Sequence, residues 1–161
     1  MVARYRGQSF AYALVSAAPL QDTNAAGIGI VFKAHDRSTI RSVCQALPGT
    51  EVLEAAYEAV MRVLEEALQV GKRRLTIYTD IHEMVQQLAD EAEVPRALLV
   101  KHLKTRGMIN QLQHVNLVVA TSDRFSARLL AEEAHLPGER TSRDTPGAED
   151  QLTLMPEDAP A

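Results

Sequence analysis

The carboxylate of Asp80 stands directly after Ile77-Tyr78-Thr79, an apolar run typical of a buried strand, and a helical pattern follows at once. A carboxylate in that position has two ordinary uses. It binds a divalent cation, which prefers oxygen ligands, or it caps the N-terminus of the following helix. The choice depends on the side chains that other elements bring to the same place. His82 follows closely, but no second metal-binding partner is spaced with it, which favours a surface position.

The elements around Asp80 can be predicted from periodicity and turn residues. Apolar alternation and turn chemistry predict strands at 8–18, 25–33, 39–45, 75–79 and 115–120. Apolar spacings of three and four predict helices at 50–70, 81–91, 96–112 and from Thr121 or Ser122 to about His135. We expect Thr50 to cap the first helix and Gly71 to follow its end. Short turns between the first three strands and helical crossovers later predict a five-stranded mixed α/β sheet with helices on its faces.

In order and spacing, these segments resemble the ribonuclease H (RNase HI-like) family over roughly residues 8–136. The resemblance implies an RNase H-like fold and a set of magnesium-binding carboxylates, of which Asp80 is the one retained. Counting back from Gly27 places the family's first acid at Ser16, and Tyr57 as an anchor places the second at Ala56. The string Ala127-Arg128-Leu129-Leu130-Ala131 carries Arg128 where the family has an aspartate.

These replacements argue against the family's chemistry. Two-metal hydrolysis holds two ions about 3.5–4 Å apart between attacking and leaving oxygens, and one aspartate cannot hold such a pair. The guanidinium of Arg128 suits direct pairing with the Asp80 carboxylate. Relocated acids are the alternative: Glu54 lies on what reads as a solvated helix face, Asp22 in a loop, and Asp123 near a helix start.

A basic helix offers a second kind of site. By the resemblance, Lys101, Lys104 and Arg106 are the expected contacts to nucleic acid, which need only positive charge. The alternative is a solvated helix face, the commoner meaning of a charge run. Aromatic residues make up only 4 % of the chain and Trp is absent, so a stacking platform is not expected.

Composition sets broad limits. The chain has 161 residues, enough for one domain with its own core, and a net charge of −4, which gives no overall attraction to nucleic acid. The single cysteine, Cys44, is expected to be a small core residue; the absence of an internal disulfide fits a cytoplasmic location. No run is long enough for a membrane span. We expect an RNase H-like domain at 1–136 and a Pro-, Gly- and acid-rich tail at 137–161.

Three functional hypotheses follow. The leading one is an RNase H-like domain that has lost nuclease activity, needs no cofactor, and binds an RNA–DNA hybrid, another nucleic acid or a protein partner. The alternative is a divergent ribonuclease H that cleaves the RNA strand of hybrids, with magnesium or manganese at Asp80. The third is an interaction protein that forms a homodimer through the edge of its sheet.

Overall fold

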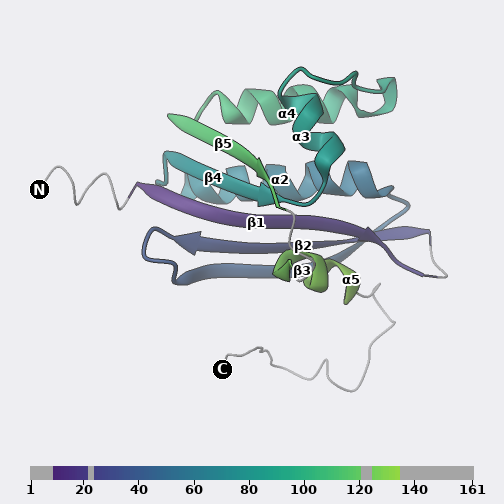
Figure 1. Cartoon of the computed structure of the whole chain (residues 1–161), viewed down its shortest axis with the longest axis horizontal. Coiled ribbons are helices and arrows are strands. Elements are labelled where there is room, and N and C mark those ends of the chain that lie inside the picture. Colours follow the sequence, from purple (N-terminus) through teal and green to yellow (C-terminus); the bar gives the residue numbers. More distant parts are fainter. Residues whose placement is uncertain (1–8, 22–23, 121–124, 135–161) are drawn as a thin grey trace, which may run out of the picture.

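A computed structural model describes residues 9–21, 24–120 and 125–134. Its five strands form one sheet in the order β3-β2-β1-β4-β5, with helices on both faces (Figure 1). β1 pairs antiparallel with β2, and β2 with β3, while β4 runs parallel to both β1 and β5. The elements in chain order are β1 (Phe10–Pro19), β2 (Ala25–Ala34), β3 (Thr39–Pro48), α2 (Val52–Gln69), β4 (Arg74–Thr79), α3 (His82–Leu88), the 3₁₀ turn η1 (Arg96–Leu98), α4 (Leu99–Ile109), β5 (His114–Val119) and α5 (Ser126–Glu132). The predicted mixed sheet is confirmed.

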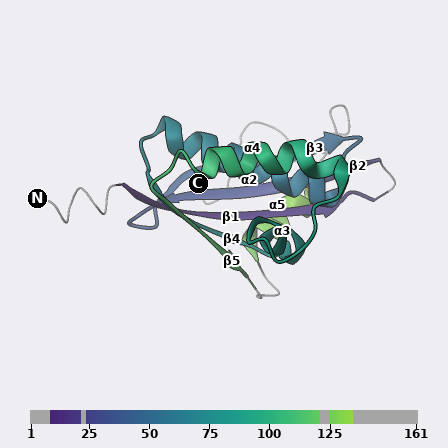
Figure 2. The ribbon, with the colours of Figure 1, turned by 90° about the horizontal axis from the view of Figure 1, so that it is seen from above.

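The main core lies between the sheet and α2. Alternate residues of β1, Ala11, Ala13 and Val15, are fully buried in a cluster with the apolar stripe of α2. α4 packs against the other side of α2, so α2 and α4 lie on the same side of the sheet (Figure 2). Because side chains alternate along a strand, the intervening residues of β1 point to the opposite face, where α5 lies.

α5 rests directly on the backbone of β2. A Cβ atom added at Gly27 would overlap the carbonyl oxygen of Ala131, and one added at Gly29 would overlap that of Ala127. Only glycine permits this approach, so the Gly-containing strand fixes how closely α5 sits to the sheet.

The ends of the elements test the cap predictions. Gly71 follows α2 with φ +76°, and the amides of Gly71 and Lys72 donate to the carbonyls of Leu68 and Ala67, which confirms the predicted helix end. The predicted cap at Thr50 is wrong. Glu51 occupies the N-cap position without a side-chain cap, and the Thr50 hydroxyl donates to the carbonyl of Pro48 instead.

Two helices differ from their predicted ranges. The stretch predicted as one helix at 96–112 divides into η1 and α4, and α3 ends at Leu88 rather than Glu91. α5 begins at Ser126; the predicted caps Thr121 and Ser122, its predicted end at His135 and the tail at 137–161 lie outside the described residues.

Cys44 is not a core residue as expected. It is exposed on β3, the edge strand, and its thiol donates to the carbonyl of Leu130 in α5 at 3.1 Å. An apolar-looking strand at an edge has a neighbour on one side only, so its residues are less buried than their types suggest. No helix among the described residues is long and apolar enough to cross a membrane.

Candidate functional site

The site forms where β1 and β4 lie side by side. Asp80 follows the last residue of β4, and the pairing of Val15 with Thr79 brings Ser16 of β1 next to it. The Ser16 hydroxyl donates to Oδ1 of Asp80 at 2.6 Å. Ser16 is fully buried, whereas the Asp80 side chain is 20 % exposed. One carboxylate oxygen therefore has a partner within the sheet.

The second carboxylate oxygen is held from α5. Nη1 of Arg128 lies 3.3 Å from Oδ2 of Asp80 and 3.4 Å from the carbonyl oxygen of Ala17. Nε of the same guanidinium donates to Glu132 one turn later, at 3.1 Å. Ser16, Asp80 and Arg128 thus lie together, with the guanidinium against the carboxylate, and we call the cluster of these three side chains the Asp80 cleft.

Helix capping does not explain Asp80. The N-cap position of α3 belongs to Ile81 and has no side-chain cap, and the amide of Ile81 donates to the hydroxyl of Thr79 at 3.2 Å. His82 is exposed at the start of α3. The carboxylate of Asp80 is therefore bonded to Ser16 and Arg128 and does not cap α3.

The residues described at the cleft do not fit a magnesium pair. Ala56 is fully buried on α2 within the hydrophobic core and has no ligand atom. No group of three or more His, Cys, Asp and Glu side chains among the described residues is arranged to hold a metal ion. Asp22 and Asp123 lie outside the described residues. Asp80 and Glu132 are the carboxylates described here, and both are paired with the guanidinium of Arg128.

The acidic face of α2 is not simply solvated. Nζ of Lys101 on α4 pairs with the carboxylates of Glu58 and Glu54, at 2.5 Å and 3.9 Å. These acids join two helices instead of facing the cleft.

The three basic residues expected to contact nucleic acid differ in their availability. Lys101 is engaged with α2, and Arg106 pairs with Asp90 and donates to the carbonyl of Leu88. Lys104 is exposed and forms no ion pair within the described part of the chain. Of the three residues, Lys104 is thus the one whose charged group is available to bind a phosphate.

A buried polar network joins α2, α3 and α4, and sequence reasoning missed it. The Gln87 amide donates to the carbonyl of Glu93 at 3.2 Å, which turns its oxygen toward the Tyr57 hydroxyl at 2.6 Å. Because Tyr57 donates to Gln87, Nδ1 of His102, 3.1 Å away, must donate to Tyr57. Burial lowers the pKa of His102 and raises the pKa of Tyr57 to about 12. The spacing of these three residues carries no sequence signal, because each lies on a different helix.

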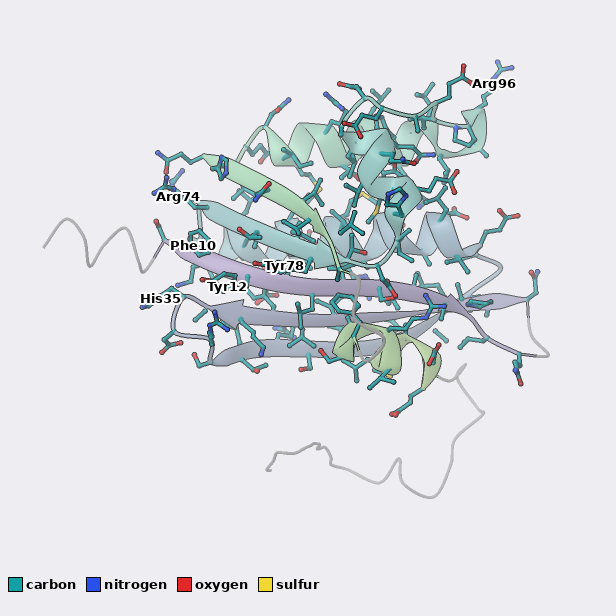
Figure 3. The ribbon with its side chains drawn as sticks, viewed as in Figure 1. Phe10, Tyr12, His35, Arg74, Tyr78 and Arg96 are labelled. Atoms are coloured by element: carbon teal, nitrogen blue, oxygen red, sulfur yellow. The ribbon has the colours of Figure 1, made fainter. Side chains whose placement is uncertain are left out.

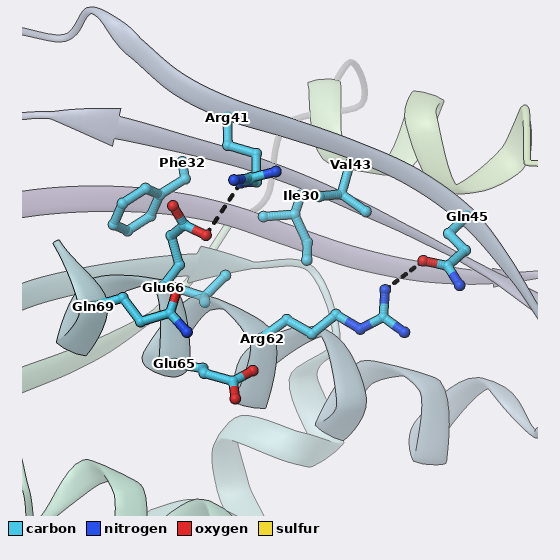
Figure 4. A pocket seen from close by; sticks show the side chains of 10 residues that line it. Ile30, Phe32, Arg41, Val43, Gln45, Arg62, Glu65, Glu66 and Gln69 are labelled. Atoms are coloured by element: carbon cyan, nitrogen blue, oxygen red, sulfur yellow. Dashed lines mark hydrogen bonds and ion pairs between the residues drawn. The ribbon is translucent and has the colours of Figure 1, made fainter.

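A groove of about 320 Å³ separates α2 from the outer strands (Figure 4). Its apolar floor includes Ile30 and Phe32, and its charged rim is largely self-paired. Arg41 pairs with Glu66 at 3.1 Å, and Arg62 donates to the side-chain oxygen of Gln45. The groove lies on the α2 side of the sheet, opposite the α5 side, so it is separate from the Asp80 cleft.

Comparison with known proteins shows which families and folds the chain is similar to. A family model described as reverse transcriptase-like matches residues 14–126. The fold is similar to the N-terminal RNase H domain of a Mycobacterium tuberculosis protein, solved as a fusion with maltose-binding protein, with TM-score 0.67, 21 % identity, and coverage of 76 % of this chain and 98 % of that one. RNase H1 from Halobacterium salinarum gives TM-score 0.69 and 18 % identity over 76 % of this chain and 94 % of that one. LC11-RNase H1, isolated from compost and solved with an RNA/DNA hybrid, gives TM-score 0.68 and 20 % identity over 77 % and 95 %. No curated protein sequence matches the chain.

Proposed function

The chain belongs to the reverse transcriptase-like family and has an RNase H-like fold, and from this we propose that it binds RNA–DNA hybrids without cleaving them. The observation that carries the proposal is the Asp80 carboxylate, whose two oxygens are held by Ser16 and Arg128 at 2.6 Å and 3.3 Å. By the resemblance, Arg128 occupies the position of a further metal-binding carboxylate.

Charge explains why this arrangement disfavours catalysis. Magnesium is bound mainly by carboxylates, substrate phosphates and water, and gives up its own water reluctantly. An ion approaching Asp80 would have to displace Arg128, and like charges at contact distance repel. Once the guanidinium left, the two carboxylates that it pairs with, Asp80 and Glu132, would remain beside the neutral hydroxyl of Ser16, which is short of the carboxylate set that the resemblance implies.

Hybrid binding is supported by two features. LC11-RNase H1, a protein of similar fold, was solved in complex with an RNA/DNA hybrid. In this chain, Lys104 presents a cation on α4 that no described acid neutralises. Since the net charge is −4, binding must depend on such local cations, and we expect its affinity to fall steeply with salt.

The competing hypothesis is a divergent, magnesium- or manganese-dependent ribonuclease H. Asp80 favours it, because this carboxylate is kept at the end of β4 and is partly exposed. Activity would require acids from outside the described residues, such as Asp22 or Asp123.

One experiment decides between them. The full chain and its Asp80→Asn variant are incubated with a labelled RNA–DNA hybrid in magnesium and, separately, in manganese, while binding is followed by anisotropy. We expect binding by both proteins and no cleavage above the variant. Cleavage by the parent chain that the variant loses would establish a rebuilt active site and overturn the proposal.

We further propose the boundary between domain and tail at residues 136 and 137, and a cytoplasmic location, which the single exposed cysteine fits. A protein partner or a second copy is a separate hypothesis. The strands that would serve it are the two edges, β3 and β5, each of which pairs with one neighbour among the described strands. Sedimentation at rising concentration tests for self-association.

A further inference from the structure

Half of one sheet face has no helix over it among the described residues. α5 lies over β2 and the C-terminal part of β1, as its contacts with Gly27, Gly29 and Ala17 require. The sheet extends well beyond this short helix (Figure 1). Beyond α5, the strands β1, β4 and β5 turn alternate residues toward this face that lie outside the main core; Thr76 is buried, and the others are partly or fully exposed. We call this surface the open sheet face: Phe10, Tyr12, Leu14, Thr76, Tyr78, Asn116 and Val118.

Three of the chain's seven aromatic residues lie on the open sheet face. Phe10, Tyr12 and Tyr78 are each partly exposed. The rings of Phe10 and Tyr12 meet edge to face, with centroids 4.9 Å apart. Tyr78 is next to Leu14, two residues along β1 from Tyr12. A rise of about 3.3 Å per residue and a strand spacing of about 4.8 Å put the two tyrosines roughly 8 Å apart.

Cations surround these rings. The Arg37 guanidinium lies 5.9 Å from the centre of the Tyr12 ring. Lys33 is the β2 neighbour of Tyr12, and Arg74 is the β4 neighbour of Phe10. Figure 3 shows Phe10, Tyr12 and Tyr78 together, with Arg74 and His35 at their border. None of these basic residues forms an ion pair within the described part of the chain.

We propose that the open sheet face binds single-stranded nucleic acid by stacking bases on Tyr12 and Tyr78. Aromatic side chains on neighbouring strands of a sheet are a known way to stack two or three successive bases. Every base has a π-face, so such binding tolerates many sequences, and nearby cations hold the phosphates. Asn116, exposed on the edge strand β5, adds an amide that can bond a base edge.

The low aromatic content predicts no stacking platform, and the proposal departs from that expectation because of where the aromatic residues lie. Composition counts the rings, whereas strand register decides where they gather. Tyr12 and Tyr78 are distant in sequence, and only the parallel pairing of β1 with β4 brings them to one surface. The inference does not depend on the fate of hybrids at Asp80, because it concerns a different ligand and a different surface.

The chain offers a built-in reporter for this site. It has four tyrosines and no tryptophan, so tyrosine dominates its intrinsic fluorescence, and two of the four belong to the open sheet face. Oligo(U) and oligo(dT) of about 12 nucleotides, near the usual site size, are titrated into the full chain. We expect quenching as bases stack, and comparison of the two probes separates RNA from DNA preference.

Matched variants test the mechanism by anisotropy of the labelled oligonucleotides. Tyr12→Leu with Tyr78→Leu keeps apolar bulk but removes the rings, while Tyr12→Phe with Tyr78→Phe keeps the rings. We expect the leucine pair to weaken binding roughly tenfold per ring, and the phenylalanine pair to bind nearly as the parent does. Arg37→Ala should lower the salt slope by roughly 0.7. Thermal melting checks that each variant is folded.

Three results would overturn the proposal: no quenching by either oligonucleotide, equal binding by the leucine and phenylalanine pairs, or binding without salt dependence. A parallel titration with an RNA–DNA hybrid distinguishes this proposal from that of hybrid binding. An RNA–DNA hybrid that the leucine pair binds as well as the parent does would leave the hybrid proposal intact whatever the single strands do. Loss of hybrid binding alone would leave stacking intact.

Discussion

Replacing Asp80 with asparagine should tighten hybrid binding, although the substitution removes the carboxylate that Ser16 and Arg128 hold. The asparagine side chain would keep an oxygen for the Ser16 hydroxyl and lose only the charge that holds Arg128. The guanidinium, now paired only with Glu132 and the carbonyl of Ala17, becomes available to a phosphate in the cleft.

The geometry sets the size of the effect. The side chains of Arg128 and Asp80 are 37 % and 20 % exposed, and their closest atoms are 3.3 Å apart. Such a partly solvated pair contributes about 0.2–1 kcal/mol, so the variant should lose up to about 1 kcal/mol of unfolding free energy and roughly 2–5 °C in Tm. A phosphate that takes the place of the carboxylate gains a similar amount. About 1 kcal/mol corresponds to roughly fivefold tighter binding at low salt, with the gain shrinking as salt rises.

The assay is fluorescence anisotropy of a labelled RNA–DNA hybrid across a salt series. Glu132→Gln is the matched control, because it removes the same charge from the other contact of Arg128, at a more exposed position (52 %). We expect a smaller gain there. Equal gains in both variants would mean that only net charge matters. Unchanged or weaker binding by the Asp80→Asn variant would refute the idea that Asp80 restrains Arg128.

Further expectations concern other parts of the fold. Gly29→Ala would drive a Cβ into the backbone of α5 and should cost about 1–3 kcal/mol or more, whereas Gly107→Ala in α4 meets open space and should stabilise by roughly 0.5–1 kcal/mol; urea unfolding measures both. Lys104→Ala should weaken hybrid binding and lower its salt slope by about 1, while Lys101→Ala should chiefly lower stability through its lost pairs with α2. Since burial lowers the pKa of His102 below 6.5, the unfolded chain takes up a proton first, and stability should fall as pH drops below about 6.5. Since the pKa of Tyr57 is raised from 10.0 to about 12, stability should also fall as pH rises from 10 towards 12.

The expectations for the two glycines, the two lysines and His102 each have a result that contradicts them. Equal urea midpoints for the two glycine variants would show that α5 adapts to the added methyl. A larger binding loss from Lys101→Ala than from Lys104→Ala would reverse the assignment of the available cation. A flat stability profile between pH 5 and 7 in the parent, or an unchanged slope in a His102→Gln variant, would remove His102 as the titrating group.

The sequence was most informative where local chemistry decides the outcome. Gly71 ends α2 because a left-handed residue is required there. The order of strands and helices predicted the sheet, and matching short strings placed Ser16 and Arg128 beside Asp80. These features depend on the spacing of residues along the chain, which the sequence shows directly.

Prediction from the sequence failed where the environment of a residue depends on elements that are distant in the chain but adjacent in the fold. Cys44 has core-like neighbours in sequence, yet it sits on an edge strand. Lys101 resembles a free cation until α2 is placed beside it. The bond between Tyr57 and His102 exists only once three helices are docked. In each case the neighbouring element that determines the environment is distant in sequence, and a single sequence does not indicate which elements pack together.

The close packing of α5 on Gly27 and Gly29 bears on the order in which Ser16, Asp80 and Arg128 come together. A helix of seven residues is too short to persist by itself in water, so α5 exists only while docked on β2. Ser16 lies on β1 and Asp80 directly follows β4, and these two strands pair with each other without α5, so Arg128 reaches them only when α5 docks. Local opening of α5 would therefore expose the Asp80 carboxylate transiently without unfolding the sheet. Backbone amides of α5 should exchange with solvent faster than those of β1. The guanidinium that pairs with Asp80 is therefore carried by the element around it that opens most readily.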